Sequence, residues 1–162
     1  MIIAPRNFRD EELFYTKEEL ESSGNSVTIA STTTDKATGM LGRAAKPDIT
    51  INDINIDDYD AVVFVGGVGS SIYFNNQKAH EIARDAYDKG KVIGAICIAP
   101  STLANAGLLK GKKVTSYPSE ERNLRSKGAV YTGNSVEKDG NIITADGPSS
   151  ARNFGRMIAN SL

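Results

Sequence analysis

The residues that most often carry catalytic and metal chemistry are scarce in this sequence. Its 162 residues include one cysteine, one histidine and no tryptophan. A single cysteine cannot form a disulfide within the chain. Without a cluster of histidine and cysteine there is also no ligand set of the kind that binds zinc. We therefore expect a protein that needs no metal and no organic cofactor.

An excess of charge of one sign is missing too. Nineteen lysine and arginine residues oppose twenty aspartate and glutamate residues, which gives a formal net charge of -1. Proteins that bind nucleic acid or anionic membranes attract them with a broad positive field, which this chain lacks. We therefore expect no nucleic acid and no membrane among the partners, and either a small-molecule substrate or a protein partner stays open.

Long apolar segments are absent as well. No hydrophobic run approaches the roughly 18 residues that span a bilayer, and the opening residues MIIAP give way to polar ones, unlike a signal peptide. These absences predict a cytoplasmic protein. With 40% hydrophobic and 24% charged residues, the chain can bury one full core, so residues 1–162 are predicted to form a single domain.

Apolar runs typical of buried parallel strands alternate with helical patterns along the chain. The runs 61–65 and 92–96 fit such strands. Between them, alanine and isoleucine recur at helical spacing over residues 76–89 and predict a crossover helix. Strands that alternate with crossover helices predict an α/β protein, a three-layer α/β/α sandwich around a mostly parallel sheet.

The remaining segments complete this pattern. A short first strand ends before Pro5; whether the chain has its true start upstream stays open. Asp10 is predicted to cap a helix that runs to about Ser22. Further on we expect strands at 27–31, 114–117 and 129–131, a loop or small hairpin at 32–47, a hairpin at 135–145, and helices at 120–126 and 149–161.

The only cysteine, Cys97, follows the strand 92–96 directly and precedes a helix that Pro100 can open and Gly107 can close. A side chain at such a corner lies at the C-terminal edge of the sheet near free backbone N–H groups. The helix dipole there is expected to favour the thiolate. From the residues alone, two interpretations stay open: a reactive nucleophile and a buried structural cysteine.

Gly66 and Gly67 end the neighbouring strand 61–65. Ligands of open α/β sheets bind at the carboxyl ends of strands. We therefore expect the two glycines and Cys97 to lie at one edge of the sheet. A plain tight turn is the alternative interpretation of the glycine pair.

Five motifs, in the same order, resemble the ThiJ/PfpI family within the DJ-one superfamily over nearly the whole chain. They are FRDEEL at 8–13, FVGGVGSS at 64–71, AICIAP at 95–100, LLKGKKVTSYP at 108–118 and ADGP at 145–148. The resemblance implies a flavodoxin-like fold of the class I glutamine amidotransferase type. It also implies a homodimer or a higher homo-oligomer.

The resemblance further implies a site built on Cys97 as nucleophile and on Glu12, a carboxyl group from the first helix that touches the thiol. A protonated Glu12 would donate a hydrogen bond to the thiolate and later carry a proton. The backbone N–H groups of Gly67 and Ile98 would hold an oxyanion. Three residues are expected to bind substrate or support the site: Gly66, Tyr117 and Pro148. For Tyr117, donation of its hydroxyl to a bound carbonyl and simple packing both stay open.

The chain also departs from the family pattern. Ile98 follows the cysteine where protease-like relatives place a histidine, and the only histidine, His80, falls in the predicted crossover helix. Ser70 and Ser71 stand where those relatives have an acidic residue. Peptide hydrolysis requires protonation of a poor amine leaving group, normally by histidine. A protease activity is therefore not expected.

The function that the resemblance implies is that of a cysteine-dependent enzyme acting on small reactive aldehydes or their adducts, like a glyoxalase or deglycase. Two alternatives stay open. One is a redox-responsive stress protein in which Cys97 oxidises to a sulfinate. The other is a weak cysteine hydrolase of esters or small amides.

Overall fold

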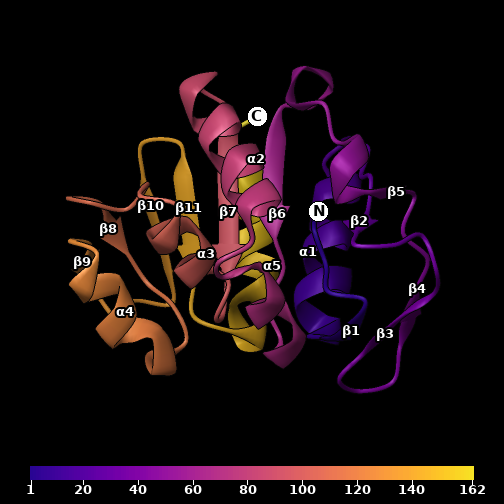
Figure 1. Ribbon diagram of the computed structural model, residues 1–162, viewed down its shortest axis with the longest axis horizontal. Helices are drawn as coiled ribbons and strands as arrows, with labels where there is room; N and C mark the ends of the chain where they lie inside the picture. The colour runs from indigo at the N-terminus through magenta and orange to yellow at the C-terminus, as the bar shows by residue number, and fades with distance from the viewer.

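A mixed sheet forms the middle of the computed structural model, which describes residues 1–162 (Figure 1). Its strand order is β10 (Val136–Asp139), β11 (Ile142–Ala145), β7 (Val92–Ile96) and β6 (Ala61–Phe64). Strands β11, β7 and β6 are parallel, whereas β10 pairs antiparallel with β11 as the second arm of a hairpin. The two expected strands 61–65 and 92–96 are confirmed and lie side by side.

The N-terminal residues connect this sheet to a further pair of strands. Ile2 forms isolated parallel bridges to Phe64 on one side and to Ala30 on the other. Ala30 belongs to β2 (Ala30–Ser31), which pairs in parallel with β5 (Ile49–Thr50). The expected first strand is therefore reduced to the bridges at Ile2, and the expected strand 27–31 is reduced to Ala30–Ser31. Pro5, which has no N–H to donate, follows soon after Ile2.

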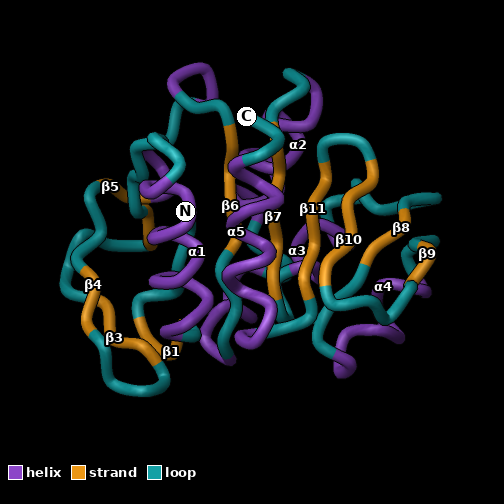
Figure 2. Tube along the Cα trace, turned by 180° about the vertical axis from the view of Figure 1, so that it is seen from behind, coloured by secondary structure: helices purple, strands orange, loops and turns teal.

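Helices cover both faces of the central sheet. On one face lie α2 (Gln77–Asp88) and α3 (Pro100–Asn105), and on the other lie α1 (Asp10–Ser22) and α5 (Ala151–Ala159) (Figures 1 and 2). The remaining helix, α4 (Glu121–Ser126), lies beside β8 (Lys113–Val114) and β9 (Val130–Tyr131) at the margin of the molecule. The expected α/β class is confirmed.

The strands divide into several sheets, and parallel pairings outnumber antiparallel ones, as expected. Two small sheets are separate from the central sheet: β1 (Arg6–Phe8) with β3 (Ala37–Gly39) and β4 (Ala44–Ala45), and β8 (Lys113–Val114) with β9 (Val130–Tyr131). Strands β3 and β4 form the small hairpin expected within 32–47.

The expected strand 114–117 ends at Val114 because the chain turns toward the corner at Cys97. There, the Tyr117 N–H donates to the Cys97 carbonyl over 2.8 Å instead of joining a ladder.

Asp10 also differs from its predicted role. It is the first residue of α1, and Arg9 is the N-cap, without a side-chain cap. The buried Asp10 carboxylate instead accepts hydrogen bonds from the backbone N–H groups of Leu41, at 2.7 Å, and Arg43, at 2.9 Å. This residue therefore ties the start of α1 to the turn between β3 and β4.

The core lies on both faces of β7, whose five residues are all buried. A Cβ atom at Gly94 would lie 2.9 Å from both Ile158 Cδ1 and Phe154 Cζ. Glycine at this position lets α5 pack directly on the strand. This packing fixes the strand that ends at Cys97.

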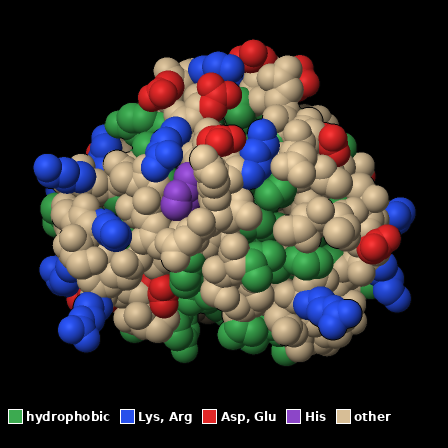
Figure 3. All heavy atoms as spheres, viewed as in Figure 1, with side chains coloured by type: hydrophobic (Ala, Val, Ile, Leu, Met, Phe, Trp, Pro, Cys, Tyr) green, Lys and Arg blue, Asp and Glu red, His purple; other side chains and the backbone are tan.

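The surface carries charges of both signs. On the face in Figure 3, blue and red side chains are interspersed, and hydrophobic side chains gather toward the lower half. None of the helices has the length and apolar character needed to cross a bilayer.

Candidate functional site

Cys97 occupies a sharp corner immediately after β7. Its φ of 64° lies in the left-handed region that side chains other than glycine rarely adopt. Its N–H donates to the Ala145 carbonyl over 2.9 Å, and its carbonyl accepts the 2.8 Å bond from Tyr117. The corner is therefore held by hydrogen bonds on both sides. Such a conformation costs about 1–3 kcal/mol and persists only when its surroundings fix it.

Glu12 reaches the same corner from the first turn of α1. Its side chain is fully buried, and Oε2 accepts a 2.8 Å hydrogen bond from the Gly66 N–H. A Cβ atom at Gly66 would press on Oε2 and would lie 2.6 Å from Cys97 Cβ. Glycine is thus required where the carboxyl group and the thiol meet.

The environment of Glu12 favours the neutral acid. Burial raises the pKa of Glu12 to about 8, although hydrogen bonds with the Cys97 thiol and the Gly66 N–H act in the opposite direction. The second carboxyl oxygen, Oε1, is buried and accepts no hydrogen bond from an N–H or O–H group. A proton on Oε1 would remove the cost of leaving a charged oxygen unpaired. The protonated form of Glu12 is therefore favoured at neutral pH.

The pKa of the Cys97 thiol is raised, contrary to the expectation that a helix dipole favours the thiolate. Burial and then the charge of an ionised Glu12 raise the pKa of Cys97, whereas the N–H groups of Gly67 and Ile98 lower it. Helix α3 has only six residues and begins at Pro100, so its dipole is small and lies beyond the corner. A protonated Glu12 removes the second cause, which couples the ionisation of the two groups.

Gly67 and Ile98, whose backbone N–H groups were predicted to hold an oxyanion, both line the cavity that contains Cys97. Their N–H groups lower the pKa of the Cys97 thiol. Gly67 has a φ of 97°, and a Cβ atom there would lie 2.5 Å from the Asn7 carbonyl oxygen. Gly67 therefore needs to be glycine for two reasons, its backbone conformation and the close approach of β1.

A cavity of about 410 Å³ opens onto this group. It is lined by Arg9, Glu12, Met40, Gly67, Val68, Cys97, Ile98, Tyr117, Ser119 and Pro148. Six of the seven residues predicted from the sequence line it, and Gly66 lies behind the wall, where it holds Glu12. Tyr117 is 49% exposed and borders the cavity instead of packing in the core. Their catalytic roles remain predictions.

Four lining residues were not predicted: Arg9, Met40, Val68 and Ser119. Arg9 lies one helical turn before Glu12 in the sequence, and this spacing could have indicated it. In the sequence, Val68 follows Gly67 directly and Ser119 lies two residues after Tyr117. Met40 comes from the turn between β3 and β4, and no local pattern connects that turn to the site.

The other residues singled out in the sequence lie elsewhere or support the loop. His80 Nε2 lies 2.8 Å from the Phe74 carbonyl oxygen, and His80 does not line the cavity. The Ser70 hydroxyl donates to the Gly67 carbonyl over 2.8 Å, which fixes the glycine loop. No histidine is therefore available to the thiol as a base.

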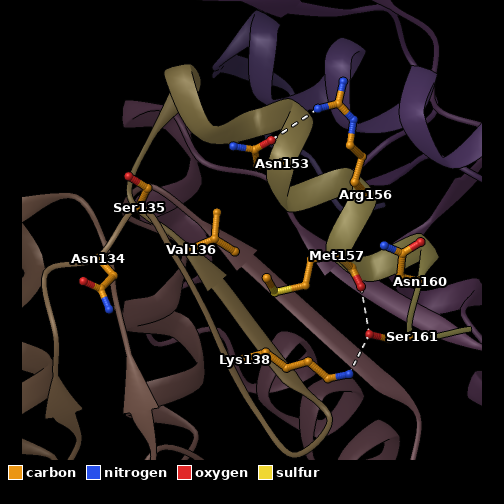
Figure 4. A pocket seen from close by; sticks show the side chains of 9 residues that line it. All are labelled: Asn134, Ser135, Val136, Lys138, Asn153, Arg156, Met157, Asn160 and Ser161. Carbon is orange, nitrogen blue, oxygen red and sulfur yellow. Dashed lines mark hydrogen bonds between the residues drawn. The ribbon is translucent and has the colours of Figure 1, made fainter.

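A larger hollow of about 530 Å³ lies between β10 and α5 (Figure 4). Most of its lining residues are polar, and some of them bond to one another, as Lys138 does to the Ser161 hydroxyl. It contains no cysteine and no acidic side chain. The smaller cavity, where an acid meets a thiol, is therefore the candidate site.

Comparison with known proteins gives consistent similarities. The model of the DJ-1/PfpI family matches residues 1–161. An uncharacterised protein of Methanocaldococcus jannaschii is 47% identical over 165 residues, covering 100% of this chain and 80% of that protein. Deglycase PfpI of Pyrococcus furiosus is 35% identical over 148 residues, covering 91% of this chain and 89% of that protein. The crystal structure of a ThiJ/PfpI domain protein from Brachyspira murdochii superposes with a TM-score of 0.97 at 32% identity, covering 99% of this chain and 95% of that one.

Proposed function

The chain belongs to the DJ-1/PfpI family, and from this premise we propose that it is a cofactor-free cysteine enzyme acting on small reactive aldehydes or their adducts. The observation that carries the proposal is that Glu12 Oε2 and Cys97 Cβ converge on Gly66 beside a substrate-sized cavity that both residues line. Its volume of about 410 Å³ falls within the range of small-molecule sites. The similarity to a protein named a deglycase supports the same chemistry.

The first proposed step joins the thiol to an α-oxo aldehyde. Cys97 sulfur forms a bond to the aldehyde carbon, while the C=O double bond opens to an alkoxide. The neutral Glu12 gives its proton to that oxygen and receives the proton of the thiol, so the product is a hemithioacetal with no net change in protons. The N–H groups of Gly67 and Ile98 stabilise the developing negative oxygen.

The second step moves a proton between the two carbons. Neutral Glu12 gives its proton to the ketone oxygen, and the carboxylate that remains removes the hydrogen from the former aldehyde carbon, which forms an enediol. Glu12 then returns this proton to the neighbouring carbon and takes the hydroxyl proton from the carbon bonded to sulfur, which gives a thioester. Water then cleaves the C–S bond of the thioester and restores the thiol. The net reaction adds one water to the aldehyde and yields a 2-hydroxy acid, without an external oxidant.

A redox-responsive protein is the second hypothesis for the same cysteine. A protonated Glu12 and two backbone N–H groups would also hold a sulfinate. Burial raises the pKa of the Cys97 thiol, however, which lowers the fraction of the oxidisable thiolate. An open cavity beside the thiol is needed by an enzyme and not by an oxidation switch. The enzyme hypothesis is therefore preferred.

The test is formation of lactate from methylglyoxal by the wild-type protein, Cys97→Ala and Glu12→Gln. We expect activity in the wild type only, with losses of at least about a hundredfold in each variant. Glu18→Gln is the matched control, because Glu18 lies on the same helix and pairs at the surface with Arg152. Absence of lactate formation by the wild type would refute the proposal.

We also propose that the chain forms a homodimer or a higher homo-oligomer, as the family resemblance implies. Light scattering coupled to size-exclusion chromatography measures the mass directly. A monomeric mass at micromolar concentration would contradict this part.

A further inference from the structure

Arg9 is the only cationic side chain that lines the candidate cavity. Its backbone N–H donates to the Gly66 carbonyl over 3.0 Å, so the residue is anchored beside the glycine loop. Its side chain is 28% exposed. The guanidinium charge is therefore partly shielded from water. Charged hydrogen bonds are stronger in such a shielded position than on an open surface.

The guanidinium group is held by Glu11 along one edge. Arg9 Nε lies 2.8 Å from Glu11 Oε2, and Nη2 lies 3.1 Å from Oε1. Arginine has five N–H donors, and this fork uses two of them. The edge formed by Nη1 and the second N–H of Nη2 donates to no protein group. That edge matches the geometry of a second carboxylate.

We propose that Arg9 binds the carboxylate of the substrate, which makes the preferred substrate an α-oxo aldehyde with a carboxylate tail. The proposal rests on the proposed function and deepens it. Because Arg9 is anchored at the glycine loop, it would hold the tail of a substrate whose aldehyde meets Cys97. A phosphate monoester is a poorer match, since it carries nearly two negative charges at neutral pH and the cavity offers a single cation.

Glu11 influences the preference for an anionic substrate over a neutral one. Its carboxylate fixes the orientation of Arg9 and also opposes the charge of a bound anion. Glu11→Gln keeps one oxygen as an acceptor and removes the negative charge. We therefore expect opposite effects from the two partners of one ion pair: loss of Arg9 weakens the preference for the anion, and neutralisation of Glu11 strengthens it.

The experiment compares 4,5-dioxopentanoate with 2-oxopentanal, which has a methyl group in place of the carboxylate. The measured quantity is the ratio of kcat/KM for the anionic aldehyde to kcat/KM for the neutral one, from formation of the two 2-hydroxy acids. We expect a ratio above one in the wild type, a ratio lowered by about tenfold or more in Arg9→Met, and a raised ratio in Glu11→Gln. An unchanged ratio in Arg9→Met would overturn the proposal.

Arg125→Met is the matched control, because Arg125 donates from Nε and Nη2 to Glu121 in a similar pair outside the cavity. Its ratio should equal that of the wild type. Calorimetric binding of the unreactive 4-oxopentanoate to Cys97→Ala, with and without Arg9→Met, separates the two proposals. If no aldehyde is converted yet Arg9 is needed to bind 4-oxopentanoate, the proposed function fails and the carboxylate site stands. If 4-oxopentanoate binds no better than 2-pentanone, the carboxylate site is refuted.

Discussion

The backbone N–H of Gly66 donates a 2.8 Å hydrogen bond to Glu12 Oε2, joining positions that are 54 residues apart. This bond places the carboxyl group of the first helix against the thiol that follows β7. It satisfies one carboxyl oxygen and leaves Oε1 buried without a donor. In the function that we propose, this carboxyl group exchanges a proton with Cys97.

Replacement of Gly66 by alanine should damage both stability and activity. The new Cβ atom would press on Glu12 Oε2 and lie 2.6 Å from the Ile96 carbonyl oxygen. Overpacking of this kind costs about 1–3 kcal/mol, and displacement of the carboxyl group should lower turnover. Urea unfolding and the methylglyoxal assay measure the two effects. Gly147→Ala is the stability control, because its Cβ atom would meet only Tyr117 Cδ2, at 3.9 Å. Equal stability of the two variants would contradict this account of Gly66.

Glycine at position 97 should give a more stable fold than alanine. The φ of 64° at Cys97 penalises any residue with a Cβ atom, and both replacements remove the thiol. We expect Cys97→Gly to exceed Cys97→Ala by about 1 kcal/mol in free energy of unfolding. Urea titrations of the two variants measure the difference. A more stable alanine variant would show that the corner is not strained in solution.

Loss of the Asp10 carboxylate should loosen the turn that contributes Met40 to the cavity. In Asp10→Ala the N–H groups of Leu41 and Arg43 lose their shared acceptor. We expect a loss of about 1–3 kcal/mol in free energy of unfolding and faster amide hydrogen exchange at these two residues. Asp58→Ala, at an exposed site, should change stability by less than about 0.5 kcal/mol. Unchanged exchange at Leu41 would contradict the role given to Asp10.

The raised pKa of Glu12, about 8, should make stability depend on pH. The unfolded chain releases this proton near the ordinary value of 4.5, whereas the folded protein retains it up to about 8. The stabilisation is therefore complete below the unfolded pKa and is lost as the pH rises toward 8, by at most about 1.4 kcal/mol per pH unit. Glu12→Gln should remove this slope. Urea unfolding of both proteins at several pH values between 5 and 8 tests this difference. Parallel plots of the free energy of unfolding against pH would contradict the raised pKa of Glu12.

Local patterns predicted those parts of the site that lie at strand ends. Gly66, Gly67 and Cys97 follow short apolar runs, and parallel strands bring their ends to one edge. Glu12 required the family resemblance, since an acid in a first helical turn is otherwise unremarkable. Met40 could not be predicted because its place depends on contacts between Asp10 and a distant turn. The protonation of the Cys97 thiol depends on how deeply the side chain is buried. The position of the following helix in the sequence does not reveal that burial.

The central claim is that Glu12 and Cys97 titrate as a coupled pair, and the rate of alkylation of Cys97 by iodoacetamide tests it most directly. Because Cys97 is the only cysteine, the rate reports on one sulfur atom. The account predicts that the pH profile of the wild type includes a step near pH 8, where Glu12 ionises, and that Glu12→Gln lacks this step and titrates once. Superimposable profiles of the two proteins would show that the acid and the thiol ionise independently, and would contradict the claim.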